Sequence, residues 1–393
     1  MKNQLMKMLE DREGEMIEIR RHLHRNPELS FQEQYTAQYI ADFYKDKDVH
    51  IQTEVGNGHG IIVTIEGGKP GKTVGLRADF DALPIIEETG LSFQSENEGV
   101  MHACGHDGHT AYMLVLADCL ISLKDSIAGR IKIIHQHAEE TPPGGAKSIV
   151  ESGALDDLDV IFGTHLFPTD PAGTIGYRSG QAMAGRNYFK LYIQGKGGHG
   201  SSPQNANDPI VAGSHFVTAV QTIVSRRLNP FDMGVITIGS FDGKGSFNII
   251  KDSIEIEGDV RYMDRQVQQV IQKEFHQLVR GLEEQFQVKC ELTYQDDYPP
   301  LYNHPAVMDQ VVSILEQVGD SDIEEIKEYP AFSGSEDYAY YLEKIPGVFF
   351  NIGCKPEKVV EAYFNHHPKF DIDEAALLVA AKAVGYVVSE YSF

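Results

Sequence analysis

A ten-residue stretch holds the densest group of chemically capable side chains in this sequence. Met101–Thr110 reads MHACGHDGHT and places three histidines, a cysteine and an aspartate just ahead of a long apolar run. Cys104 and His106 flank a glycine, so both can turn toward one point, and a thiolate with an imidazole suits zinc or another borderline metal. A reactive thiol is disfavoured because no second cysteine lies nearby to resolve an oxidised one. A metal site is favoured, but a thiol site and a polar histidine-rich loop stay open.

Further polar side chains follow predicted strands, at the points where these strands end. Asp81 comes after the run KTVGL, and His165 comes at the end of the run DVIFG. Glu139 and Glu140 stand side by side after RIKII, where one carboxylate could ligate a metal while the other faces a substrate water. Ligands of open α/β sheets bind beyond the carboxyl ends of strands, so we expect these side chains to meet at one edge. With His366 near the C-terminus, the donors could hold more than one ion.

The elements that would position these residues alternate between strands and helices. Short β-branched runs such as IIVTIEG and GRIKIIHQH alternate with helical patterns such as TAYMLVLADCLISL, which is typical of a largely parallel sheet flanked by helices. From about residue 181 the order becomes β-α-β-β-α-β, the signature of a split βαβ or ferredoxin-like domain. The predicted fold class is therefore α/β, with a main domain of residues 1–180 and 298–393 and an inserted α+β domain of residues 181–297.

The bulk composition excludes several kinds of partner. The 393 residues carry a formal net charge of −24, so nucleic-acid backbones and anionic membranes would be repelled, and we expect neither as a partner. No segment approaches the roughly 18 apolar residues of a membrane span. The four cysteines are scattered without a C-x-x-C pair, and the N-terminus lacks a signal-peptide pattern. A reducing compartment fits this cysteine usage better than a disulfide framework, and we expect a cytoplasmic protein.

Seven motifs, in order along nearly the whole chain, resemble those of the metal-dependent amidohydrolases of the M20 peptidase family. The similarity is to the subgroup of N-acyl-amino-acid, hippurate and indole-acetyl-amino-acid hydrolases. His137 stands where this family often has proline, and Gln204 stands where a histidine is common, but these departures remove no implied ligand or base. The resemblance implies a catalytic α/β domain interrupted by a smaller lid domain, in agreement with the division above. The motifs are RADFDALP, HACGHDGHT, HAEE with the following GGA, IFGTHL, GKGGHGSSP, GSEDYAYYLEKIPGVFFNIG and HHPKFDID.

Residue by residue, the resemblance implies a two-metal site with a general base. Glu139 would be the base, and His199 in the GGHG motif of the lid would help to stabilise the oxyanion. Asp81 would orient a metal ligand, while Asn248 and Arg261 would hold the substrate carboxylate. The metals would be two divalent ions per subunit, zinc or manganese before cobalt or nickel. Their implied ligands are Cys104, His106, Glu140, His165 and His366.

The implied function is hydrolysis of the amide bond of an N-acyl-amino acid by a metal-bridged water, with Glu139 as the base. A dipeptidase or aminopeptidase on the same two-metal site is the alternative. A non-catalytic metal-binding homologue is disfavoured because a binding protein needs no base beside Glu140, and a thiol redox protein would keep its activity after chelation. The expected partners are a small N-acylated amino acid or short peptide, and further copies of the chain in a homodimer or higher homo-oligomer.

Overall fold

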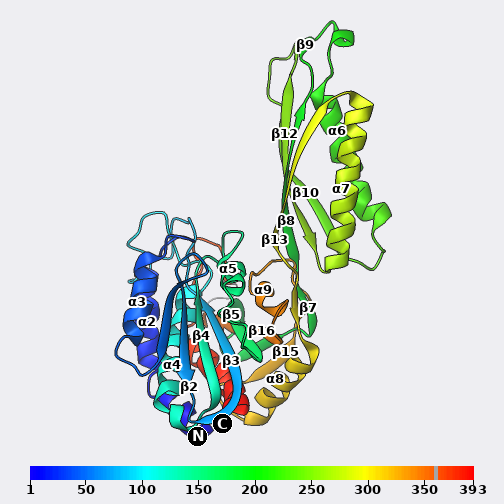
Figure 1. Cartoon of the computed structure of the whole chain (residues 1–393). Helices are drawn as coiled ribbons and strands as arrows, with labels where there is room; N and C mark the ends of the chain where they lie inside the picture. The colour runs from blue at the N-terminus through cyan, green and yellow to red at the C-terminus, as the bar shows by residue number, and fades with distance from the viewer. Residues whose placement is uncertain (358–361) are drawn as a thin grey trace. The chain divides into compact units, whose positions relative to one another are not determined.

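The computed structural model describes residues 1–357 and 362–393 of the chain, which divides into two compact units (Figure 1). Unit 1 consists of Met1–Ala182, Tyr302–Pro330 and Asp337–Phe393. Unit 2 consists of Met183–Leu301 and Ala331–Glu336. Unit 2 is therefore inserted into the chain of unit 1.

Unit 1 is built on a mixed eight-stranded sheet with a parallel centre. The strand order is β1-β2-β4-β3-β5-β16-β6-β15. The central strands β4, β3, β5 and β16 run parallel to one another. At one edge β2 and β1 are added antiparallel, and at the other β6 pairs antiparallel with β16 and parallel with β15. Because parallel strands end at the same edge of a sheet, the segments that follow β3, β4 and β5 come together. The strands are β1 (His50–Val55), β2 (Gly60–Glu66), β3 (Lys69–Asp79), β4 (Ala128–Gln136), β5 (Val160–Pro171), β6 (Thr174–Tyr177), β15 (Glu325–Glu328) and β16 (Gly347–Lys355).

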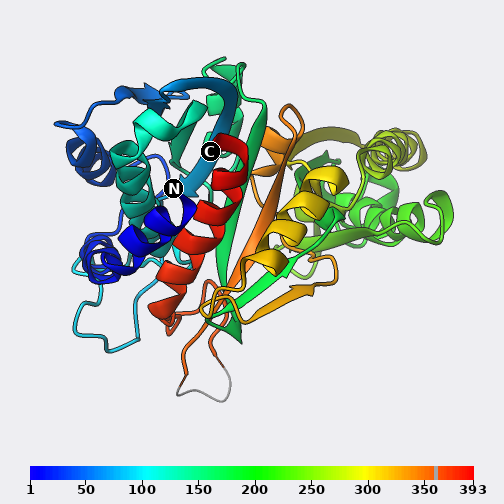
Figure 2. The ribbon, with the colours of Figure 1, turned by 90° about the horizontal axis from the view of Figure 1, so that it is seen from below.

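Helices pack against this sheet and against one another. Helices α4 and α10 contact each other and the central strands β3 and β5 (Figure 2). Helix α4 is apolar nearly all round, which is why it is buried along almost its whole length. The helices are α1 (Lys2–Glu10), α2 (Glu13–Arg25), α3 (Gln34–Tyr44), α4 (His106–Ser122), α5 (Gly145–Glu151), α8 (Pro305–Val318), α9 (Ala339–Leu342) and α10 (Ala375–Ser392), with a 3-10 turn η1 (Lys124–Ser126).

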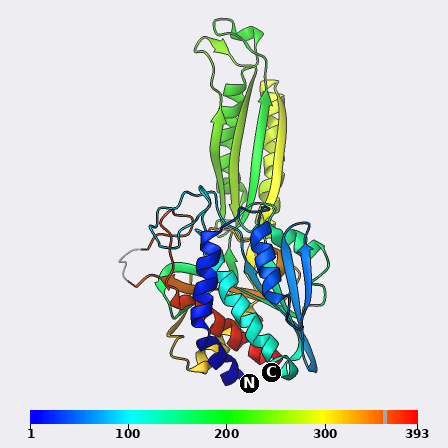
Figure 3. The ribbon, with the colours of Figure 1, turned by 90° about the vertical axis from the view of Figure 1, so that its left-hand side faces the viewer.

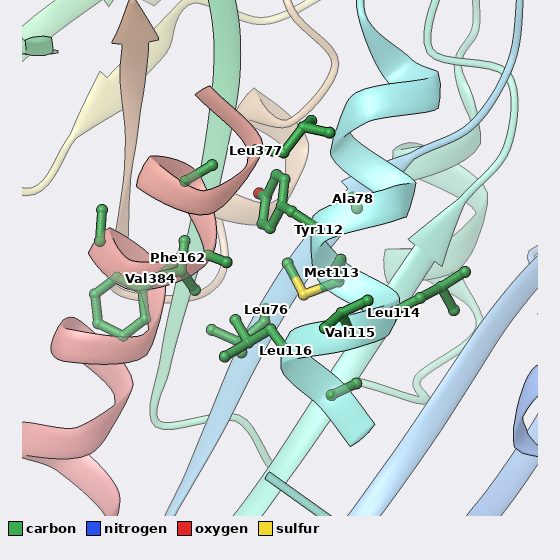
Figure 4. Close-up of a cluster of buried hydrophobic side chains, with 14 of the residues drawn as sticks. Leu76, Ala78, Tyr112, Met113, Leu114, Val115, Leu116, Phe162, Leu377 and Val384 are labelled. Atoms are coloured by element: carbon green, nitrogen blue, oxygen red, sulfur yellow. The ribbon is translucent and has the colours of Figure 1, made fainter. Parts of the chain in front are cut away.

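The core of unit 1 lies between the central strands and these helices. Leu76 of β3 and Phe162 of β5 pack in one cluster with Leu116 of α4 and Val384 of α10 (Figure 4). A fully buried leucine or phenylalanine contributes about 1.5–3 kcal/mol relative to exposure, so this cluster fixes α4 firmly on the sheet. The chain ends of unit 1 lie close together, as Figure 3 shows, and the charged groups of Lys2 and Glu390 pair at 2.6 Å.

Unit 2 is a four-stranded antiparallel sheet that carries two long helices, α6 and α7. The strand order is β10-β12-β8-β13, and the chain order is β8-α6-β10-β12-α7-β13. Phe189, Phe216 and Phe275 form its apolar centre, and the side chains of Asp208 and Asp264 cap the two helices. The elements are β8 (Gly185–Gln194), β9 (Gly198–His199), η2 (Pro203–Asn205), α6 (Pro209–Arg227), β10 (Gly234–Asp242), β11 (Ile249–Ile250), β12 (Ser253–Tyr262), α7 (Arg265–Phe286) and β13 (Lys289–Tyr298), with β7 (Gly180–Met183) and β14 (Leu301–Asn303) where the chain passes between the units.

The predicted fold class is confirmed, since a mostly parallel sheet flanked by helices carries a separate α+β domain. The exact domain boundaries stay a prediction. Ala331–Glu336 is part of unit 2, although the flanking segments belong to unit 1. The backbone N–H of Ala184 explains this grouping, because it donates to the carbonyls of Phe332 and Gly334. Among the described residues, no helix is both long enough and apolar enough to cross a bilayer.

Candidate metal centre and active site

Four of the five predicted metal ligands lie at the start of α4, after the end of β4, or in the middle of β5, which continues past the strand end that the sequence predicts for His165. His106 is the first residue of α4, and Gly105 before it has a φ of 92°, a left-handed conformation that favours glycine. This turn lets Cys104 and His106 face the same side. Glu140 follows the end of β4, and His165 lies within β5. The topology of the sheet therefore brings these residues to one edge, as the sequence predicts.

The fifth predicted ligand, His366, comes from the segment between β16 and α10. Its backbone N–H donates to the carbonyl of Ala103 at 2.7 Å, and its φ of 72° places it in the left-handed region. Asn365 beside it donates its side-chain amide to the carbonyl of Cys104 at 3.2 Å. These bonds fasten the C-terminal segment to the loop that carries Cys104, which places the imidazole of His366 beside the other ligands.

The donor atoms form two sets that share one sulfur. Ligand atoms of Cys104, His106 and His165 lie within 4.8 Å of one another, and so do those of Cys104, Glu140 and His366. The Sγ of Cys104 is 3.4 Å from Nε2 of His165, and Oε1 of Glu140 is 3.2 Å from Nε2 of His366. Two overlapping sets of sulfur, nitrogen and oxygen donors are the arrangement expected for a pair of metal ions that share a ligand.

The polar atoms of this cluster fit a metal centre better than a set of internal hydrogen bonds. Nε2 of His106 and Oε1 of Glu140 are buried and have no hydrogen-bond partner within residues 1–357 and 362–393. Buried polar atoms are normally satisfied, so two orphaned acceptors that face a thiol and two imidazoles indicate a site for cations. The residues present therefore fit the two divalent ions that the sequence predicts.

The charges around Cys104 and His165 favour the same conclusion. Burial raises the pKa of the Cys104 thiol well above its usual value, and the carboxylates of Glu140 and Glu139 raise it further. A thiolate can therefore exist here only beside a cation. Burial lowers the pKa of His165 well below its usual value, and its Nδ1–H donates to the carbonyl of Leu166 at 3.0 Å. The lone pair of Nε2 is thus left to face the cluster.

Asp81 contacts two of the proposed ligands from outside the cluster. Its Oδ1 accepts the Nδ1–H of His106 at 3.2 Å, and its Oδ2 accepts the backbone N–H of Glu140 at 3.0 Å. Burial alone would raise the pKa of Asp81, but the hydrogen bonds from His106, from the backbone of Glu140 and from Ser30 lower it below its usual value. The carboxylate therefore fixes the tautomer of His106 with Nε2 free to bind a metal.

Glu139 lies beside the donor atoms, only 6 % exposed. One of its carboxylate oxygens lies within 4.8 Å of ligand atoms of His106 and Glu140. Its Oε1 accepts the backbone N–H of Asp337 at 3.4 Å. A carboxylate held next to the metal cluster is within reach of a water molecule located there.

The three remaining predicted site residues belong to unit 2. His199 is exposed in β9, and its Nδ1 accepts the backbone N–H of Ser201 at 3.2 Å, so in the neutral ring the proton is on Nε2. The carbonyl of Asn248 accepts the N–H of Gly200 at 2.9 Å, which places Asn248 next to the His199 turn. Arg261 of β12 donates to Asp259 at 2.8 Å. Their roles toward a substrate stay predictions.

Residues 75–390 match the sequence profile of peptidase family M20/M25/M40. The chain belongs to this family. Its relatives include YhaA of Bacillus subtilis (strain 168), which is named as an amidohydrolase and is 44 % identical over 100 % of this chain and 98 % of its own length. The N-acetyl-L-cysteine deacetylase of the same organism is 38 % identical over 94 % of this chain and 86 % of its own length.

A solved structure supports the family assignment. The crystal structure of the Bacillus subtilis YXEP protein, described as a dinuclear metal binding peptidase of the M20 family, has a TM-score of 0.81 and 31 % identity. The match covers 96 % of this chain and 98 % of that one. The resemblance to the M20 family read from the seven sequence motifs is thereby confirmed.

Two buried networks of hydrogen bonds and ion pairs in this M20 chain were not predicted from the sequence. His109 lies one turn after His106, but its Nδ1–H donates to Asp79 at 2.6 Å and its Nε2 accepts the N–H of Leu166 at 3.0 Å. Both ring nitrogens are thus used internally. Arg77 pairs with the other oxygen of Asp79 at 2.6 Å. The spacing of histidines in MHACGHDGHT could have suggested His109 as a ligand, and only the contacts show that it braces the site instead.

The second missed network joins α2 to the start of α4. His24 donates its Nδ1–H to Asp107 at 2.8 Å, its Nε2 lies 3.3 Å from Glu87, and Arg20 lies 3.2 Å from Asp107. Burial alone would lower the pKa of His24, but the hydrogen bonds to Asp107 and Glu87 raise it to about 9. A protonated His24 therefore ties the first turn of α4, which carries His106, to the N-terminal helices.

Proposed function

We propose that this chain is a metal-dependent amidohydrolase that cleaves the amide bond of N-acyl-amino acids. The observation that carries the proposal is the position of Glu139 beside two donor sets that share Cys104. A site that only bound metal would not need a second carboxylate, that of Glu139, held by its own contact next to the ligand Glu140. The names of relatives point the same way, since they include an amidohydrolase and an N-acetyl-L-cysteine deacetylase.

The metal ligands in this proposal are those that the sequence predicts. Cys104 would be shared, His106 and His165 would complete one ion's set, and Glu140 and His366 the other's. When bound, two divalent ions would polarise the scissile carbonyl and favour the ionised form of an attacking water. A thiolate with imidazoles suits zinc, and the carboxylate with imidazoles also suits manganese, cobalt or nickel.

Glu139 is the proton carrier of the proposed reaction. Its carboxylate would take a proton from the attacking water and deliver it to the nitrogen of the leaving amine, so that the amide breaks into a carboxylate and an amine. The N–H of Asp337 at one carboxylate oxygen limits the orientations of the side chain, which keeps the other oxygen directed to one place.

Unit 2 would supply the contacts to the substrate. His199 in its neutral form carries its proton on Nε2 and is exposed, so it could donate to a developing oxyanion. Asn248 and Arg261 would hold the carboxylate of the amino acid, for which the guanidinium offers paired donors. We further propose a homodimer or higher homo-oligomer through unit 2, because its edge strand β10 exposes Val235 and Phe241. The cytoplasmic location stays a prediction.

The test is hydrolysis by metal-reconstituted protein across a matched set of substrates. The set contains N-acetyl, N-benzoyl and free-amino versions of the same amino acids or dipeptides, and Glu139→Gln serves as the inactive control. Cleavage of the acylated substrates, lost in the variant, would support the proposal. A preference for free-amino dipeptides would favour the alternative, a dipeptidase or aminopeptidase on the same site. No turnover by protein with bound metal would contradict both.

A further inference from the structure

The segment between α2 and α3 braces the loops that carry the proposed active site. The hydroxyl of Ser30 donates to Oδ2 of Asp81 at 2.7 Å, on the oxygen that also accepts the N–H of Glu140. A few residues later, Oε1 of Glu33 accepts the backbone N–H of Ala138 at 2.8 Å. One short stretch of chain, remote in sequence from every metal ligand, thus reaches both Asp81 and the segment that leads into Glu139.

Glu33 is an unusual residue to find in this position. Its side chain is fully buried, and its Oε2 has no hydrogen-bond partner among the residues that the structure describes. Burial raises the pKa of Glu33 to about 8, and the charge of Asp81 contributes to the rise. A buried carboxyl that lacks an ion-pair partner costs stability, which the hydrogen bond that Glu33 accepts from Ala138 partly offsets.

Ala138 is the residue whose conformation depends on that bond. Its φ is 52°, in the left-handed region that residues with a Cβ rarely adopt, and it is fully buried. Its carbonyl accepts the N–H of Gly145 at 3.0 Å, while its N–H is held by Glu33. Both backbone polar groups of Ala138 are therefore fixed, and these two bonds maintain the turn from which Glu139 projects.

We propose that Glu33 is a positioning residue for hydrolysis: by accepting the N–H of Ala138 it holds the left-handed turn that aims the carboxylate of Glu139. The inference rests on the proposed function, in which Glu139 is the base. Glu33 acts as a hydrogen-bond acceptor, so an amide in its place serves equally well. Its loss displaces Glu139 while the metal ligands keep their own contacts.

The test compares three variants by kcat, KM and metal content per chain. Glu33→Met keeps the volume of the side chain but removes the acceptor, and we expect kcat to fall about 10- to 100-fold with KM unchanged, as a base displaced by about 1 Å would cause. Glu33→Gln keeps the acceptor and retains kcat within about threefold. The matched control is Glu28→Met, because Glu28 also accepts a backbone N–H, that of Thr36 at 2.7 Å, at the start of α3. We expect this control to lower the melting temperature and leave kcat unchanged.

Three outcomes would overturn the inference: a wild-type kcat in Glu33→Met, an equal loss in Glu33→Gln, or a loss explained by missing metal. If Glu33→Met yields no folded protein, Glu33→Asp replaces it, since its carboxyl is one methylene short of Ala138. The same fall in kcat would then support the inference, and a wild-type kcat would overturn it. Glu139→Gln, measured in parallel, distinguishes a failure of the proposed base from a failure of the positioning role of Glu33. If that variant keeps full activity the proposed base is wrong, whereas its inactivity beside an active Glu33→Met overturns only the positioning role.

Discussion

Asp81→Asn should weaken metal binding without removing a metal ligand. The two carboxylate oxygens of Asp81 accept hydrogen bonds on opposite sides: Oδ1 from His106, and Oδ2 from the backbone of Glu140 and the hydroxyl of Ser30. An asparagine has one acceptor oxygen and one NH₂ donor. If its oxygen takes the place of Oδ2, where two donors converge, its NH₂ group faces the Nδ1–H of His106.

The expected loss of metal affinity in Asp81→Asn follows from the hydrogen bond that is lost, the one between Oδ1 and His106. His106 would keep the backbone carbonyl of residue 81 as an acceptor at 3.0 Å, so its tautomer is retained but the charged acceptor that orients the ring is gone. A hydrogen bond to a charged group contributes about 1.5–3 kcal/mol. Through a factor of ten per 1.36 kcal/mol, this corresponds to about 10- to 100-fold in metal affinity, the range found for partners of metal-binding histidines.

The assay is competition of the protein with a chelator of known affinity, followed by metal analysis. The control is Asp118→Asn, which removes a carboxylate of the same helix α4 that pairs with Arg12 and Lys47 far along the helix from His106. The control should bind metal as tightly as the wild type. An unchanged metal affinity in Asp81→Asn would refute the orienting role of Asp81.

Three further predictions concern the base, the shared ligand and the His24 network. Glu139→Gln should lower kcat about 10²- to 10⁴-fold while metal content stays at the wild-type level, and metal loss in this variant would contradict its role as base. Cys104→Ser should bind less metal in both sets, whereas Cys290→Ser, in unit 2, should bind the full amount; equal binding by the two would contradict a shared sulfur. The pKa of His24 is raised from 6.5 to about 9 in the folded state, so its stabilisation is full below the unfolded value and is lost as pH rises through 9. His24→Gln should therefore lower the free energy of unfolding by about 3 kcal/mol at pH 6 and by little at pH 10, and a pH-independent loss in denaturant titrations would contradict this.

The sequence predicts those parts of the fold whose burial leaves a clear pattern. Apolar runs such as TAYMLVLADCLISL identify α4, and β-branched runs identify β2 to β5, because these elements are buried on most sides. The edge strand β1, with the sequence HIQTEV, is mostly exposed and has no such pattern. The separation of α1 from α2 at Asp11–Arg12 is equally invisible, since apolar spacing continues across it.

The sequence predicts the proposed metal ligands of the site but misses the residues that hold those ligands and the base in place. Cys104, His106, Glu140 and His165 could be placed together because strands of a parallel sheet end at one edge. The bonds of Glu33 to Ala138 and of His109 to Asp79 depend on where side chains from distant segments meet, and on which histidine nitrogen carries the proton. No local pattern in one sequence encodes either property.

The central claim is that a two-metal centre on this donor cluster performs amide hydrolysis. The most direct test removes metal with a chelator, then adds a divalent ion stepwise while metal per chain and hydrolysis of an N-acetyl amino acid are measured on the same samples. We expect activity to disappear on chelation and to return as binding approaches two ions per chain, and we expect Cys104→Ser not to recover. Hydrolysis that survives complete metal removal would contradict a metal-dependent mechanism, and full binding of two ions by Cys104→Ser would contradict the shared sulfur.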